Sequence, residues 1–393
     1  MNTSLRRILS AAVGITVVAG LAIAQQKPPG ADQVFKNIQA LKGLSVDDFM
    51  ETMGVISAAL AFDCSDCHTN AGTDKVDWAA DTPRKVISRV MINMVAKINK
   101  ENFGGQNKIT CWTCHHNRDR PADTANFETI YGEAQLIPDV VITQAQGVPS
   151  ATAILDKFIE ASGGAAKLAG LKSIDATGTQ AGFGGFGGGG MAEVAAEYPD
   201  KKATIILFRA ETGRGDQIRS YDGKAGWVRT PLNVLGEYQL EGGDLAGARF
   251  DAQLMFPQQI KQILTNLKSS NPTTITSLPV SESQAAVQKG AATQRTARVN
   301  VVQGTGPNGL LVTLYFDEQT GLLDRELRYS QTPIGRVPVQ VDFADYRDVN
   351  GIKLPYYMAY VWLDGRDSIV LNDVKTNVKI DESKFGRPPS RKK

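Results

Sequence analysis

The residues of this chain that are best suited to chemistry are concentrated in two short segments. The sequence has four Cys and three His among its 393 residues. All four Cys and two of the His lie in two pentapeptides, Cys64-Ser65-Asp66-Cys67-His68 and Cys111-Trp112-Thr113-Cys114-His115. Two thiols three positions apart lie on one side of a helical turn, and the residue that follows carries an imidazole. The chain therefore presents the same three donor groups twice.

The pattern C-x-x-C-H is the attachment motif of c-type haem. The two thiols of each motif can reach the two vinyl groups of one porphyrin, and the imidazole then faces the iron. The sequence predicts two covalently bound c-type haems (iron), with Cys64, Cys67, Cys111 and Cys114 as attachment residues and His68 and His115 as iron ligands. A covalently bound haem cannot dissociate, which suits an exported carrier.

Three other uses of these cysteines are weaker but stay open. Exported cysteines commonly form disulfides, although pairing does not explain why a scarce His follows each second Cys. A zinc site would need two further ligands for each pair, and the only other His is His116. A thioredoxin-like redox site needs one C-x-x-C beside a βαβ unit, not two that are followed by His.

Helices are expected around both motifs. Val34, Ile38 and Leu41 follow helical spacing, with Gly43 as a C-terminal cap. A second helix begins after Ser45, which can cap it together with Asp48, and a third begins with Thr82 and Pro83 and ends near Gly104-Gly105. The apolar faces of the second and third helices share one spacing: Phe49, Met53, Ile56 and Leu60 in the second, Ile87, Met91, Met94 and Ile98 in the third. A C-x-x-C-H follows each helix, which indicates a duplicated unit of helix and haem.

The first residues resemble an export signal. Arg6 and Arg7 precede an apolar stretch from Ile8 to Leu21, and Ala22-Ile23-Ala24 fits a cleavage site. The alternative is an uncleaved membrane anchor, because the apolar stretch is only slightly short for a span. In both cases we expect the remaining chain outside the cytoplasm: periplasmic, and membrane-associated if the segment is kept.

The whole chain divides into segments with different sequence patterns. We expect a signal peptide at 1–24, a mostly α diheme cytochrome c domain at 26–123, a Pro-containing linker at 124–149 and an α+β domain at 150–388. In the last part, strands are expected at Lys202–Phe208, Leu311–Phe316, Val337–Phe343 and Tyr356–Trp362, with hairpin turns at Asp222-Gly223, Asn350-Gly351 and Asp364-Gly365. Helices are expected at Ala151–Ser162 and at Ala246–Leu267, the second broken at Pro257. The predicted fold class is multi-domain, with a helical haem domain before an antiparallel-sheet domain.

Charge argues against one class of partner. The full chain has 43 basic and 41 acidic side chains. Removing residues 1–24 takes away Arg6 and Arg7 and no acidic residue, which leaves 41 of each. The absence of excess positive charge argues against a protein that binds nucleic acid electrostatically.

The segment from Val34 to His115 resembles the cytochrome subunit of bacterial photosynthetic reaction centres. The matching residues are Phe35-Lys36-Asn37-Ile38, Phe49 to Met53, Arg89-Val90-Met91-Ile92-Asn93-Met94, Ile98-Asn99 and Thr110-Cys111-Trp112-Thr113-Cys114-His115. In that family a helix upstream of each motif supplies Met to the far face of the haem. The resemblance implies Met53 as sixth ligand of the first haem and Met91 as that of the second, with Met50 and Met94 as competitors. Members typically carry four haems, and His116 replaces their usual Arg.

The last part resembles the half-barrel of outer-membrane lipoprotein carriers. The residues that carry this resemblance are Tyr315-Phe316-Asp317, Thr320-Gly321-Leu322-Leu323 and the run from Asp345 to Pro355. The resemblance implies a curved sheet around an apolar cavity. An apolar ligand, a docked partner and a purely structural role all stay open for this cavity.

These features favour an electron-transfer relay that is not an enzyme. His/Met coordination closes both irons to substrate and gives relatively high potentials. The expected partners are redox proteins, membrane-bound ones included. One alternative is a diheme peroxidase-type enzyme in which one haem keeps an open site. Another is a binding module for an apolar ligand, with the haems as a redox switch.

Overall fold

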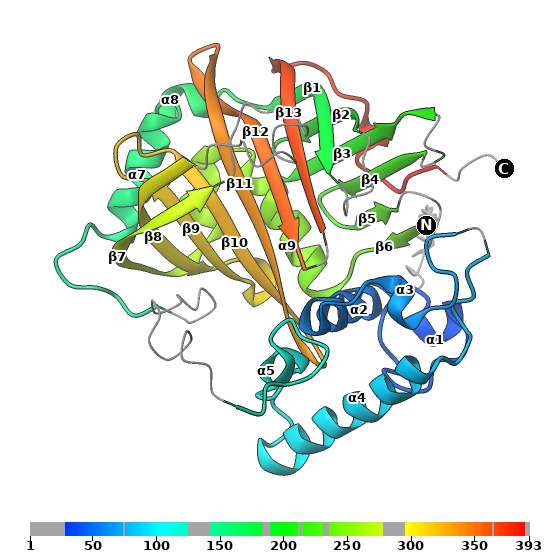
Figure 1. The fold of residues 1–393 in the computed structure, drawn as a ribbon. Coiled ribbons are helices and arrows are strands. Elements are labelled where there is room, and N and C mark those ends of the chain that lie inside the picture. The colour runs from blue at the N-terminus through cyan, green and yellow to red at the C-terminus, as the bar shows by residue number, and fades with distance from the viewer. Residues whose placement is uncertain are drawn as a thin grey trace, which may run out of the picture.

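The structure is a computed structural model that describes residues 28–389 except 74, 125–141, 183–188, 211–212, 214, 231–235, 278–294 and 364. The expected signal peptide and most of the expected linker lie outside the described residues. Figure 1 shows a group of helices below a large curved sheet.

The elements described before residue 125 are helices, some of which contain the two motifs and some of which lie beside them. They are α1 (Ala31–Val34), α2 (Val46–Leu60), α3 (Cys64–Cys67), α4 (Pro83–Asn102) and α5 (Cys111–His115). The predicted cap of α2 is confirmed, because Ser45 Oγ accepts a hydrogen bond from the Asp48 backbone N–H at 3.0 Å. The predicted start of α4 is also confirmed, with Thr82 as cap and Pro83 as its first residue.

The helix expected through Val34, Ile38 and Leu41 is wrong. The observed helix α1 ends at Val34, and both Asn37 and Leu41 have a φ of 61°. Positive φ is incompatible with a right-handed helix. Asn37 Nδ2 instead donates to the Ala79 carbonyl oxygen at 2.7 Å. This segment is therefore hydrogen-bonded to the loop that precedes α4.

The second part of the chain is built on an antiparallel sheet, as predicted. Among the described residues, thirteen strands form it in the order β6-β5-β4-β3-β2-β1-β13-β12-β11-β10-β9-β8-β7. Their bounds are β1 Ser173–Gly182, β2 Gly190–Glu197, β3 Lys201–Phe208, β4 Asp216–Tyr221, β5 Gly226–Arg229, β6 Glu237–Gln239, β7 Thr265–Ser277, β8 Arg295–Thr305, β9 Leu311–Asp317, β10 Leu323–Thr332, β11 Gly335–Val349, β12 Ile352–Trp362 and β13 Gly365–Thr376. Each expected strand lies within one of these.

The helices of the sheet domain are α7 (Ala151–Ala161), α8 (Ala165–Leu168), α9 (Gly242–Leu254) and α10 (Ile260–Ile263). The helix expected at Ala246–Leu267 begins earlier and ends earlier than predicted. A short 3-10 turn at Pro257–Gln259 interrupts it, as proline requires. Leu264 is extended and Thr265 already pairs with Thr305, so strand pairing ends the helix.

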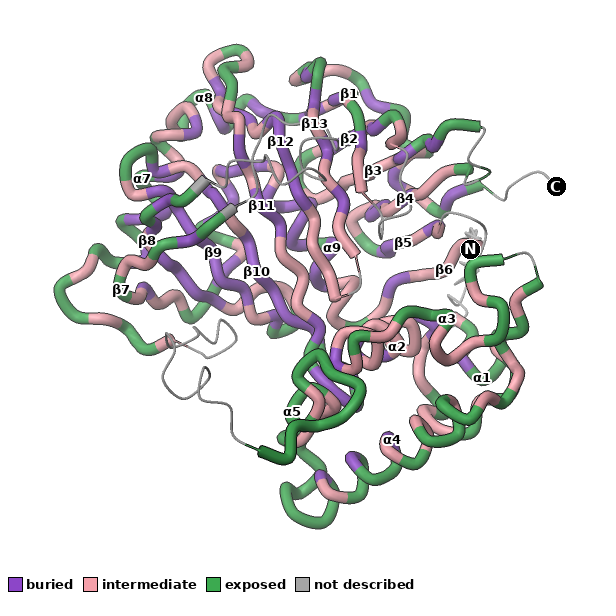
Figure 2. The backbone as a smooth tube through the Cα atoms, in the orientation of Figure 1, coloured by how far each residue is buried: buried purple, intermediate pink, exposed green. Residues whose placement is uncertain are grey.

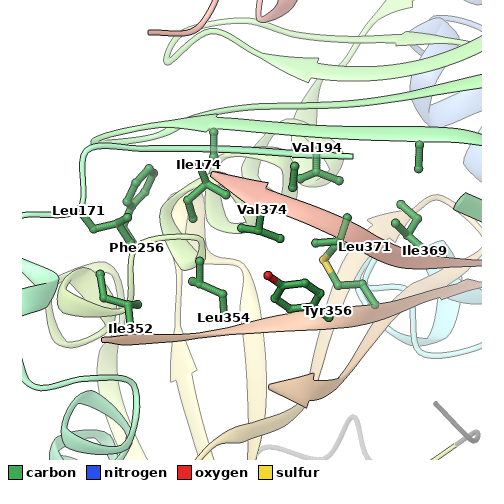
Figure 3. Close-up of a cluster of buried hydrophobic side chains, with 14 of the residues drawn as sticks. Leu171, Ile174, Val194, Phe256, Ile352, Leu354, Tyr356, Ile369, Leu371 and Val374 are labelled. Carbon is green, nitrogen blue, oxygen red and sulfur yellow. The ribbon is translucent and has the colours of Figure 1, made fainter. Parts of the chain in front are cut away.

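The sheet curves around α9, which contacts β3, β4 and β5 on one half and β10 on the other. Two large apolar clusters fill the concave side. One joins Phe256 to strand residues such as Ile174, Ile352 and Leu371 (Figure 3). The other packs α7 and α9 on β8, β9 and β10, with Leu155, Phe250 and Phe316 among its residues. Figure 2 shows how much more of the sheet than of α4 is buried.

The helical part is packed against one end of this sheet. Helix α2 contacts β6, β10 and β11, and the tip of the β10–β11 hairpin lies beside it. A small apolar cluster spans the two parts, formed by Val55 of α2, Ile92 of α4, and Ile334 and Val337 of the hairpin. The boundaries of the expected domains stay a prediction.

Candidate functional site

The first motif forms one capped helical turn. Asp63 caps α3 by accepting a hydrogen bond from the Ser65 N–H at 2.7 Å, and Asp66 returns the contact by accepting from the Asp63 N–H at 3.0 Å. Cys64 and Cys67 therefore lie at the two ends of a single turn, and neither forms a disulfide. This is the arrangement that two neighbouring thioether bonds require.

His68 directly follows this turn and is half-buried. Its ring lies edge-on to Trp78, with centroids 5.1 Å apart. Burial lowers the pKa of His68, and the nearby ammonium of Lys85 lowers it further. A neutral imidazole is the form that binds iron. Among the hydrogen bonds within the described residues, His68 Nδ1 has no partner although it is buried.

The second motif repeats the capped turn with different residues. Thr110 Oγ1 accepts from the Thr113 N–H at 3.3 Å, and Thr113 Oγ1 accepts from the Thr110 N–H at 3.0 Å. His115 Nδ1 lies 3.0 Å from the carbonyl oxygen of Arg118. A carbonyl can only accept, so Nδ1 carries the proton and Nε2 keeps the lone pair that an iron would need.

Burial raises the pKa of both Cys67 and Cys111. The pKa of Cys111 rises to about 11, so its thiol is protonated. A protonated, half-buried thiol is a poor candidate for a thiolate metal ligand or a redox-active cysteine. No group of three or more His, Cys, Asp or Glu side chains in the described parts of the chain is placed to hold a metal ion.

Asn99 holds the loop that leads into the second motif, a role that sequence reasoning missed. The side chain is 3% exposed. Its Nδ2 donates to the Ile109 carbonyl oxygen at 2.7 Å, and its Oδ1 accepts from the N–H groups of Lys108 and Ile109 at 3.1 and 2.9 Å. A polar residue in the last turn of an amphipathic helix was the available signal.

The apolar face predicted for α4 is only partly covered by protein. Of its residues, Ile87 is 60% and Met94 42% exposed, whereas Met91 and Ile98 are half-buried. Val90 beside them is 57% exposed, and Trp112, inside the second motif, is 50% exposed. Apolar side chains exposed together on one helix indicate a binding surface. A flat apolar group such as a porphyrin fits this face and the cysteines beside it.

The structure places both proposed methionine ligands on long helices next to the motifs. Met53 of α2 and Met91 of α4 are half-buried, whereas Met94 is exposed. Helix α2 contacts α5, and α4 contacts α3. Each of these two helices thus precedes one motif in the sequence and contacts the other motif in space. The assignment of Met53 and Met91 as iron ligands stays a prediction. Met50 is also half-buried, and His116 is exposed.

Buried acids lie where α2 meets the sheet domain. Asp47 Oδ2 accepts from the Glu241 N–H at 2.9 Å, and Glu51 Oε1 accepts from Ser330 Oγ at 2.8 Å. Burial raises the pKa of Glu51 to about 8, and the neighbouring charge of Asp244 adds to this. The protonated carboxyl lets α2 pack against the sheet without a buried charge.

The concave side of the sheet contains a small cavity with a mainly apolar lining. It is about 50 Å³, and Lys202, Asp251 and Glu326 are among its lining residues. A water needs about 10–15 Å³, so the cavity has room for a few water molecules. Buried oxygens of Ser162, Asp251 and Glu326 lack hydrogen-bond partners among the described groups, which suits water there.

Comparison with known proteins agrees with the resemblance of the first part. The family model of the photosynthetic reaction centre cytochrome C subunit matches residues 5–153. The corresponding subunit of Rubrivivax gelatinosus is 32% identical over 105 residues, which are 26% of this chain and 27% of that protein. That of Thermochromatium tepidum is 32% identical over 109 residues, 26% of each chain.

The first part of the chain thus resembles the cytochrome c subunits of photosynthetic reaction centres, a class of c-type cytochromes with covalently bound haem. The chain spans about a quarter of the length of the curated relatives that it matches.

Two solved structures are similar to the remainder. A DUF1329 family protein from Desulfovibrio piger has a TM-score of 0.37 and 10% identity, covering 61% of this chain and 98% of that one. A LolA superfamily protein from Nitrosomonas europaea has a TM-score of 0.35 and 13% identity, with the same coverage. Among the described residues, no helix has the length and apolar character needed to cross a membrane.

Proposed function

We propose that this protein is an extracytoplasmic diheme c-type cytochrome that relays electrons between redox partners. The observation that carries the proposal is the repeated capped turn. In α3 and in α5, two cysteines three residues apart are followed by a histidine. The matches to reaction-centre cytochrome subunits support the same function.

Each haem would be held by its own motif, Cys64 and Cys67 for one and Cys111 and Cys114 for the other. When bound, a haem supplies an iron that can accept and release one electron. The chain would contribute the imidazoles of His68, whose pKa is lowered by burial, and of His115, which is oriented by the Arg118 carbonyl. The apolar side chains of α4 would exclude water from the porphyrin, which favours a higher potential.

Met53 and Met91 would provide the sixth ligands and leave no open position for substrate. A thioether is a soft ligand that favours reduced iron. Closed coordination makes the protein a carrier, whereas a diheme peroxidase needs one open iron. The partners would be other redox proteins, membrane-bound ones included, and the site of action the periplasm.

Two measurements test the proposal. Mass spectrometry of the mature protein should give the polypeptide plus two haems, located at the two C-x-x-C-H peptides. The reduced protein should not bind exogenous carbon monoxide. A mass with no haem would refute the cytochrome function, and stoichiometric carbon monoxide binding would favour the peroxidase-type alternative.

An apolar ligand in the sheet domain stays a prediction. The described cavity is too small for a lipid, and charged residues line part of it. Native mass spectrometry of the full chain would reveal a bound lipid or quinone if the concave face opens.

A further inference from the structure

We propose that the β10–β11 hairpin of the sheet domain forms one wall of the second haem site, with Ile334 at its tip as a positioning residue. The inference rests on the proposed diheme function. It assigns a role in the haem site to residues more than 200 positions away in the sequence.

The hairpin is hydrogen-bonded to the start of the second motif. The Cys111 N–H donates to the Ile334 carbonyl oxygen at 3.2 Å. Cys111 is the first residue of α5, where an N–H has no partner inside the helix. The hairpin supplies that partner. Beside it, Asn107 Nδ2 donates to the Thr332 carbonyl oxygen at 2.9 Å.

The hairpin also encloses this region with apolar side chains. Ile334 is 1% exposed and packs with Val55 of α2 and Ile92 of α4. Half-buried Cys111, whose sulfur would bond to the porphyrin, packs against the same cluster. The Ile334 side chain is therefore buried against the first residue of the second motif.

The position of this tip is fixed by the sheet. Thr332 pairs with Gly335 in the β10–β11 register, and Thr332 Oγ1 donates to the Gly335 carbonyl oxygen at 2.8 Å. The backbone approaches α2 closely, since a Cβ on Gly335 would lie 2.8 Å from Val55 Cγ1. A larger residue there would push the wall away from α2.

The first motif is held in another way. Thr82, the cap of α4, is hydrogen-bonded to Cys67, and Arg84 of α4 forms an ion pair with Asp66. The sheet domain thus acts on the second site, and a change in the hairpin tip should alter one haem and not the other. An apolar wall excludes water and disfavours the more highly charged oxidised iron, so opening it should lower the potential.

The test compares Ile334→Ser with Ile369→Ser in the full-length holoprotein. Ile369 is also 1% exposed but belongs to the large core cluster of the sheet domain. A redox titration followed by haem absorbance should show that one of two midpoint potentials falls in Ile334→Ser, and that neither changes in Ile369→Ser. Two unchanged potentials, or two equal shifts, would overturn the proposal.

Haem counting separates this inference from the proposed function. Wild-type protein without haem would refute the diheme function itself, and with it the wall. Ile334→Ser protein with haem only at Cys64 and Cys67 would support the wall, because attachment at the second motif would then depend on it. Asn107→Ala removes only the hydrogen bond to Thr332 and should lower the same potential by less. If Ile334→Ser does not accumulate, an unchanged potential in Asn107→Ala overturns the proposal.

Discussion

The Thr82 hydroxyl joins the first motif to the helix that follows it. Thr82 Oγ1 donates to the Cys67 carbonyl oxygen at 2.7 Å and accepts from the Lys85 N–H at 3.3 Å. One side chain therefore caps α4 and fixes the end of α3. The distance between the Cys67 thiol and the exposed apolar face of α4 depends on this contact.

Replacing Thr82 by Ala should remove both hydrogen bonds. Loss of a threonine cap costs about 1 kcal/mol. Urea unfolding, monitored by circular dichroism, should show this decrease in the free energy of unfolding. Thr82→Ser retains the hydroxyl and should stay close to wild type. Equal losses in the two variants would show that the methyl group matters, not the cap.

Asn99→Ala should destabilise the protein more than a surface change on the same helix. It leaves the N–H groups of Lys108 and Ile109 and the Ile109 carbonyl, which make part-buried hydrogen bonds, without their present partner. An unsatisfied polar group costs about 1–3 kcal/mol where water cannot reach it. Asn102→Ala is the matched control, because Asn102 is exposed and makes one bond to the Ile98 carbonyl oxygen. Similar unfolding free energies for the two variants would contradict the role given to Asn99.

Local features of this chain could be predicted from sequence because they depend on neighbouring residues. Examples of such local features are the C-x-x-C-H turns, the helix caps Ser45 and Thr82, and the hairpin turn at Asn350-Gly351. The helix predicted through Ile38 was wrong because Asn37 bonds to Ala79, 42 positions away. Burial of Ile334 beside Cys111 depends on the whole sheet register, which no local pattern contains.

The methionine assignment can be tested with four single variants. Met53→Ala and Met91→Ala should each open one iron, lower its potential and allow one equivalent of carbon monoxide to bind to the reduced protein. Met50→Ala and Met94→Ala are the controls and should do neither. If a control variant opens an iron, the ligand lies one helical turn from the predicted position.

Glu326 should make stability depend on pH. Burial raises its pKa to about 8 in the folded protein, and the charge of Asp251 adds to the effect. The unfolded chain releases this proton near the model value of 4.5, so the contribution is full below that pH and is lost as the pH rises to about 8. Glu326→Gln keeps a neutral group and should gain stability over wild type across this range, by on the order of 1–3 kcal/mol at pH 8. Urea unfolding from pH 4.5 to 8.5 measures the difference in free energy of unfolding between Glu326→Gln and wild type. The control variant Glu101→Gln, which changes an exposed residue of α4, should show no such difference.

Protease should cut the chain first in the expected linker at 124–149. Pro138 and Pro149 interrupt it, and the sequence offers no core of its own. The N-terminal fragment should keep its covalent haems. Before denaturation it should also co-elute with the sheet domain, because the hairpin tip is buried against α2 and hydrogen-bonded to Cys111. Size-exclusion chromatography of the nicked protein, with absorbance spectra of each fraction, measures both outcomes. Fragments that separate at once with unchanged spectra would show that the two parts are independent, and would count against a haem-site wall supplied by the sheet.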